Sequence, residues 1–65
     1  MKVGDIVTFM NEESIYARWF FGKMGEVINI RKGHCKVRWL VPCRYHDRWT
    51  PASSLRMSDF ERADI

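Results

Sequence analysis

The stretch from Gly22 to Val41 restricts the fold of this chain more than any other part of the sequence. From His34 to Val41, apolar residues alternate with mostly basic ones, a period of two that predicts a strand with one face in a core. From Glu26 to Arg31, apolar residues occupy both faces, which indicates a central and curved strand. The Lys32-Gly33 pair between these runs supplies a residue that can take a positive φ, as a tight hairpin turn requires. Two strands joined by a tight turn are therefore expected.

The size and composition of the chain indicate one folded domain over residues 1–65. A chain of 65 residues buries only roughly 60% of the surface that it exposes when unfolded, so an enclosed active site is not expected. Its content of 46% hydrophobic and 14% aromatic residues is too high for a disordered chain. No apolar run approaches the ~20 residues that span a bilayer, and the first residues lack the apolar region of a signal peptide. Two cysteines permit at most one disulfide, so we expect a cytoplasmic protein without membrane contact.

The residues before the hairpin are expected to form one strand and one long loop. Lys2 to Phe9 is a short β-branched run, with Gly4-Asp5 as a bend near its start and Val3 on the same face as Val7 and Phe9. Met10 to Phe21 shows no strand alternation and is too long for a hairpin turn. Two structures remain open for it: a brief helical turn from 12 to 14 capped by Asn11, or an irregular excursion.

Short elements are expected after the hairpin, because prolines interrupt the apolar pattern twice. They are a loop at 42–47, a strand at 48–50, a single tight helical turn at 51–55 and a last strand at 55–57. Pro51 suits the first position of such a turn, with Thr50 as a cap. The end, 58–65, is expected to be an amphipathic turn or a frayed tail anchored by Phe60. The core expected from all these elements consists of Val7, Phe9, Val27, Ile30, Val37, Trp39 and Leu55.

The order of these elements resembles the small SH3-like barrels, the group that contains Tudor, chromo-like and KOW domains. More narrowly, it resembles the short stand-alone SH3-like proteins that bacteriophages encode. The positions that carry the resemblance are Gly4-Asp5, Gly25-Glu26-Val27, Val37-Arg38-Trp39, Trp49 and the run from Pro51 to Leu55. The resemblance implies an all-β, five-stranded SH3-like barrel with a long first loop and a short 3-10 turn before the last strand. It also implies a binding or structural role without catalysis, in a host cytoplasm or a virion.

The end of the long loop is unusually aromatic for such a barrel. Five large apolar residues fall within seven positions, namely Ile15, Tyr16, Trp19, Phe20 and Phe21. Not all can face one small core, and exposed apolar patches of this kind usually mark interaction sites. We therefore expect a protein partner or a second copy of the chain to bind at Tyr16, Trp19, Phe20, Phe21 and Tyr45. The alternative is that the loop folds over an open end of the barrel and buries these rings.

Basic residues are concentrated in the second half of the chain. Between residues 31 and 48 there are six, opposed only by Asp47: Arg31, Lys32, Lys36, Arg38, Arg44 and Arg48. The net charge of that segment is +5, whereas the net charge of the whole chain is +3. The rest of the chain is therefore negative. Such a face binds phosphates independently of sequence, and stacking on Trp19, Phe20 or Tyr45 would favour RNA or single-stranded DNA. Nucleic-acid binding is thus the alternative function, and a merely solvated strand face is the other explanation.

Metal, cofactor and catalytic chemistry are not expected. His34, Cys35, Cys43 and His46 are metal-ligand residue types, but adjacent His34 and Cys35 point to opposite faces of a strand and do not match a zinc pattern. No nucleophile is placed beside a base, and no phosphate-binding glycine loop precedes a helix. An aromatic cage of Trp19, Tyr45 and Trp49 for a methylated lysine is conceivable, although no spacing brings the three rings together.

Overall fold

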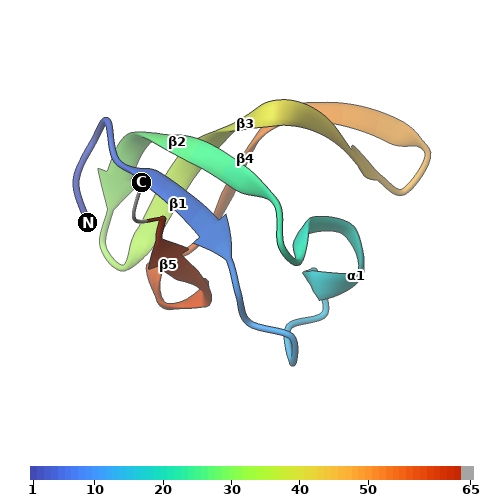
Figure 1. Cartoon of the computed structure of the whole chain (residues 1–65), viewed down its shortest axis with the longest axis horizontal. Helices are drawn as coiled ribbons and strands as arrows, with labels where there is room; N and C mark the ends of the chain where they lie inside the picture. The colour runs from blue at the N-terminus through green and yellow to red at the C-terminus, as the bar shows by residue number, and fades with distance from the viewer. Residues whose placement is uncertain (64–65) are drawn as a thin grey trace.

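The chain folds into five antiparallel strands in one open sheet, seen in a computed structural model that describes residues 1–63 (Figure 1). The elements are β1 (Ile6–Phe9), α1 (Ala17–Phe20), β2 (Met24–Arg31), β3 (His34–Tyr45), β4 (Arg48–Arg56), the 3-10 helix η1 (Met57–Asp59) and β5 (Phe60–Arg62). The sheet order is β4-β3-β2-β1-β5, so β4 and β5 are its edges. The expected all-β class is confirmed, with the sheet open rather than closed. No helix within the described residues is long and apolar enough to cross a membrane.

The hairpin of β2 and β3 forms at the position that the sequence predicted. Arg31 pairs with His34, and the two turn residues Lys32 and Gly33 have φ values of 25° and 80°. Positive φ at both central residues is the geometry that fits the twist of the flanking strands. A register shift between Val27 and Asn29 marks a bulge in β2, and bulges bend the strand that contains them. The expected curvature of this strand has this origin.

Strands β3 and β4 are longer than the sequence indicated, and the expected loop at 42–47 is wrong. β3 continues to Tyr45, and a two-residue turn at His46 and Asp47 leads into β4. The pairing of β3 with β4 shifts register between Arg38 and Cys43. Pro42 lies inside that shift, and Pro51 lies opposite it on β4. Because neither position belongs to the regular ladder, the missing proline N–H groups do not interrupt it.

The 3-10 turn and the last strand occur later in the chain than expected. The helical turn at 51–55 and the strand at 55–57 are wrong, because β4 occupies 48–56 and is followed by η1 and β5. The η1 helix is attached to the long loop by Asn11, whose Nδ2 donates to Asp59 Oδ1 at 2.8 Å, and by the Met10 N–H, which donates to the Asp59 carbonyl. Phe60 is buried, as expected for an anchor. Of the expected tail at 58–65, the last two residues lie outside the described range.

The N-terminal segment turns before the first strand begins. Gly4 has a φ of 98° and its N–H donates to the Val27 carbonyl, so β1 starts at Ile6. The bend at Gly4-Asp5 is thus confirmed, but Val3 lies outside the strand and is 60% exposed rather than facing the core. In the long loop, the Glu13 N–H donates to Asn11 Oδ1 at 3.0 Å and closes a turn. The helix of this loop is α1, later than the helical turn considered at 12–14.

The core lies on the inner face of the sheet and is closed on one side by the long loop. Six of the seven expected core residues are buried, and Ile30 is half-buried against them. Four further residues complete the core, namely Phe20, Cys35, Cys43 and Phe60. The Phe20 ring stacks on Trp39 with centroids 4.9 Å apart, and Trp39 Nε1 donates to Ser53 Oγ at 3.1 Å. The long loop therefore contributes a central core residue.

Candidate nucleic-acid interface and aromatic cluster

Basic side chains gather on the outer face of the sheet, opposite the core. Residues of β2, β3 and β4 that lie side by side form three rows on this face. The rows are Arg31-His34-Arg56, Asn29-Lys36-Ser54 and Glu26-Arg38-Ala52. We call this surface, together with Lys32 in the turn, the outer basic face. It carries five Lys or Arg side chains and one acidic residue, Glu26.

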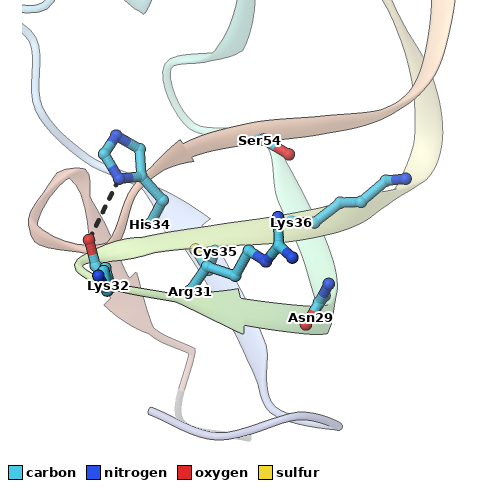
Figure 2. A pocket seen from close by; sticks show the side chains of 7 residues that line it. All are labelled: Asn29, Arg31, Lys32, His34, Cys35, Lys36 and Ser54. Atoms are coloured by element: carbon cyan, nitrogen blue, oxygen red, sulfur yellow. Dashed lines mark hydrogen bonds between the residues drawn. The ribbon is translucent and has the colours of Figure 1, made fainter.

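Three of the five cations of the outer basic face line a shallow hollow at the β2–β3 turn. The hollow measures about 760 Å³ and is lined by Asn29, Arg31, Lys32, His34, Cys35, Lys36 and Ser54. Figure 2 shows Asn29, Arg31 and Lys36 projecting from the β2–β3 hairpin, with Ser54 contributed by β4. Amide, hydroxyl, guanidinium and ammonium groups all donate hydrogen bonds. The hollow therefore offers donors from three strands to an anion.

Ion pairing inside the protein uses little of this charge. Within residues 1–63 the structure contains one salt bridge, from Arg38 Nη2 to Glu26 Oε1 at 3.3 Å. Both side chains are exposed, at 65% and 38%, so the pair contributes at most about 1 kcal/mol of stability. Arg31, Lys36 and Arg56 have no carboxylate partner in the described residues.

The remaining two candidate phosphate contacts lie on the far part of the β3–β4 hairpin. Arg44 pairs with Trp49 across the hairpin, and Arg48 pairs with Tyr45 next to the turn. Cys43 is buried, so the adjacent Arg44 points away from the core. This part of the hairpin, residues 43–50, extends beyond the rest of the sheet (Figure 1), and we call it the hairpin arm. The six basic residues that the sequence indicated thus fall into two groups, four on the outer basic face and two on the hairpin arm.

The rings expected to bind a protein partner mostly pack against one another. We call Tyr16, Trp19, Phe20 and Tyr45 the aromatic cluster. The Phe20 and Tyr45 rings are stacked at 5.7 Å, and the Trp19 and Tyr45 rings meet edge to face at 4.7 Å. Phe20 is 2% exposed and the other three are half-buried. The loop thus covers one side of the core, as in the alternative derived from the sequence, and Phe20 is inaccessible to a partner.

Two apolar residues of the long loop remain on the surface. Ile15 is 76% exposed and Phe21 is 42% exposed, at either end of the aromatic segment. Phe21 is therefore the one expected protein-binding residue that presents much of its ring to solvent. Trp49, on the hairpin arm, is 69% exposed. It lies outside the aromatic cluster, because its ring forms no aromatic pair within the described residues.

The cysteines and histidines do not come together in the structure. Cys35 and Cys43 are both buried and unpaired with one another, whereas His34 and His46 are exposed. Burial raises the pKa of the Cys35 thiol, and the Asp59 carboxylate raises it further. Burial also raises the pKa of the Cys43 thiol, partly offset by Lys23. Within residues 1–63 no group of three metal-ligand residues gathers.

Two contributors to the exposed surface escaped the sequence reasoning. Arg56 belongs to the outer basic face because β4 extends to residue 56, whereas a turn and a new strand were expected there. The alternation of polar Ser54 and Arg56 with apolar Leu55 was a sequence signal for a strand that continues to residue 56. As a ligand-binding residue, Trp49 was considered only for an aromatic cage with Trp19 and Tyr45. The structure places Trp49 on the hairpin arm, where it pairs with Arg44. The rings of Trp19 and Tyr45 instead pack against each other.

Comparison of this chain with protein-family models, with curated proteins and with solved structures gave no match. What the surface can do follows from its side chains. The outer basic face presents cations and neutral hydrogen-bond donors, which together bind anions and phosphate groups. The rings of the aromatic cluster pack against one another. Among the surfaces described, the outer basic face has the chemistry best suited to an anion.

Proposed function

We propose that this chain is a non-catalytic nucleic-acid-binding module whose ligand crosses the outer basic face. The observation that carries the proposal is the set of three cross-strand rows, which hold four Lys or Arg side chains against Glu26 alone, with Lys32 in the adjacent turn as a fifth cation. Protein surfaces usually mix both signs of charge, whereas a face of one sign attracts the opposite sign and raises its local concentration. A polyanion is the partner that such a face suits.

Phosphate contacts would supply most of the affinity. Three arginines can each donate two parallel hydrogen bonds to a phosphate, namely Arg31, Arg38 and Arg56. Lys36 acts as a point charge. Asn29 and Ser54 add neutral donors beside Lys36 in the same row. Contacts of this kind fix the ligand without reading its sequence, and their strength falls as salt rises. The protein then binds many sequences and depends steeply on ionic strength.

The test is a salt series with a 12-nucleotide labelled RNA, followed by fluorescence anisotropy. Each phosphate contact on a single strand contributes about −0.7 to the slope of log K against log salt. Arg31→Glu with Lys36→Glu removes two contacts, so the slope should become shallower by about 1.4 and the affinity should fall. Lys2→Glu with Lys23→Glu is the matched control. Each of the two double variants lowers the formal charge from +3 by four units.

The two double variants separate a specific face from net charge. The control should retain most of the binding, because Lys2 and Lys23 are exposed but lie outside the three rows. Equal loss of affinity in both would mean that net charge alone attracts the ligand. A wild-type protein that binds neither RNA nor DNA at low salt contradicts the proposal outright.

Protein binding or self-association is the second candidate, and one observation favours it. A hollow of about 320 Å³ lies between the aromatic cluster and β4, and its lining includes Tyr16, Phe20, Tyr45 and Leu55. Ile15 and Phe21 are exposed on the same loop. An apolar residue of a partner would gain burial there. Light scattering distinguishes the candidates, because self-association predicts a molar mass that rises with concentration and is insensitive to RNA.

The relation to SH3-like barrels belongs to the same proposal. What supports it is the number of strands, the tight turn at Lys32 and Gly33, the long first loop and the 3-10 helix directly before the last strand. The SH3-like barrel would then be represented by an open sheet with β4 and β5 at its edges. A bacteriophage origin, and a location in a host cytoplasm or virion, follow only from this resemblance. They stay predictions.

A further inference from the structure

Trp49 is the one tryptophan that offers its ring to solvent. It is 69% exposed, whereas Trp39 is 4% exposed in the core. Trp19 is half-buried, and its ring is contacted by Tyr45, by His46 and by the Arg18 guanidinium at 5.3 Å. Stacking of a planar ligand needs a free aromatic face. Of the three tryptophans, Trp49 has the most accessible ring face.

One cation shares the face of the hairpin on which Trp49 lies. Arg44 lies directly across the hairpin from Trp49, whereas Arg48, which precedes Trp49 in β4, belongs to the opposite face. Neither arginine forms a salt bridge within the described residues. An exposed aromatic ring beside an unpaired cation is an arrangement with which proteins hold the bases and phosphates of single strands.

The outer basic face continues along β3 towards this ring. Lys36, Arg38 and Arg44 occupy even positions of one strand, the positions that alternate with the buried Cys35, Val37, Trp39 and Cys43. No acidic residue lies on β3 between them. Arg44 lies eight positions after Lys36, at most about 26 Å away at about 3.3 Å per residue. That length corresponds to about eight nucleotides at about 3.4 Å per stacked step, or fewer in an extended strand.

We infer that the ligand of this protein is a single-stranded nucleic acid, one base of which stacks on Trp49 while its phosphates follow β3 to the outer basic face. This inference rests on the proposed function and specifies its substrate. A duplex keeps its bases stacked on each other, so their flat faces are not available to a side chain. Trp49 would therefore add affinity for single strands and nothing for duplexes.

The experiment compares a 12-nucleotide oligo(dT) with a 12-base-pair DNA duplex, by anisotropy at one low salt concentration. Stacking of one base contributes about 1–3 kcal/mol, so Trp49→Ala should weaken oligo(dT) binding roughly 5- to 150-fold and leave duplex binding within about twofold. Trp49→Phe keeps an aromatic face and should recover much of the loss. Leu40→Ala is the matched control, because Leu40 is 56% exposed on the same hairpin but has no ring. Far-UV circular dichroism checks that each variant is folded.

The outcomes separate the inference from the function on which it rests. Wild-type protein that binds oligo(dT) and duplex equally well keeps the proposed function and overturns the single-strand inference. If Trp49→Ala lowers the oligo(dT) affinity no more than Leu40→Ala does, the proposed function is likewise kept and the single-strand inference is overturned. Binding to neither probe overturns both. A molar mass that falls on Trp49→Ala, with unchanged nucleic-acid binding, would assign Trp49 to an interface between copies and refute the inference.

Discussion

Removing the Trp39 side chain should strongly destabilise this fold. The side chain is 4% exposed, stacks on Phe20 at 4.9 Å with an interplanar angle of 12°, and lies 6.1 Å from the Phe60 ring. Truncation of a buried tryptophan to alanine costs about 3–5 kcal/mol. A domain of 65 residues has a total stability of about 3–10 kcal/mol at about 0.05–0.15 kcal/mol per residue. Trp39→Ala should therefore be largely unfolded or have a strongly lowered urea midpoint.

Two milder variants measure the hydrogen bond of Trp39 separately from its packing. Trp39 Nε1 donates to Ser53 Oγ at 3.1 Å. Ser53→Ala leaves this indole N–H without its acceptor, at a cost of about 1–2 kcal/mol. Trp39→Phe keeps an aromatic ring against Phe20 but has no N–H, so the same Ser53→Ala change should cost clearly less in that background. The difference, about 1 kcal/mol, is the coupling energy of the pair.

Urea denaturation followed by far-UV circular dichroism is the appropriate assay, because the variants change the tryptophan fluorescence itself. The unfolding free energy and the slope of the transition should be compared with the wild type at equal protein concentration. A Trp39→Ala protein that unfolds cooperatively within about 1 kcal/mol of the wild type would refute the placement of this ring at the centre of the core.

Two further predictions concern the backbone and the thiols. Gly25→Ala should lower the urea midpoint by the equivalent of about 1–3 kcal/mol. The added Cβ would lie 3.1 Å from the Arg38 carbonyl oxygen and 3.3 Å from Trp39 Cε3. An unchanged midpoint would mean that β3 can move away freely. Burial raises the pKa of Cys35 and Cys43 above the ordinary 9.0, so above about pH 9 the unfolded chain loses these protons first and stability should fall. A urea midpoint that stays constant from pH 8 to pH 10, or a fall that persists in a Cys35→Ala, Cys43→Ala protein, would contradict this origin.

The parts of the fold that follow from local pattern could be predicted from the sequence. The alternation in β3 identified its buried face, and the Lys32-Gly33 pair located the turn, because both signals depend only on neighbouring residues. The prolines misled the interpretation of the second half. Pro42 and Pro51 usually end or interrupt a strand, but here the register shift between Arg38 and Cys43 removes both from the ladder. A shift of this kind depends on how two distant segments pair, and no local pattern shows it.

The candidate site was only partly visible in the sequence for the same reason. Arg31, Lys36 and Arg38 followed from strand alternation, whereas Arg56 required the true length of β4. The aromatic residues of the long loop were identified, but their exposure was not, because the direction of a loop is fixed by tertiary contacts. Asn11 and Asp59 provide one such contact, 48 positions apart in sequence. That contact holds the loop against the η1 helix at one side of the core, where Phe20 packs.

The outer basic face and the aromatic cluster differ in how cleanly their roles can be tested. Phe20 stacks on Trp39 and on Tyr45, so any substitution in the cluster changes folding and binding together. Arg31 and Arg56 lie on either side of His34 in one row. Neither has an acidic partner in residues 1–63, so neutral substitutions there should leave stability unchanged or slightly raised. Loss of nucleic-acid binding by such variants would therefore report on binding alone, and a loss of stability instead would mean that these cations hold the fold.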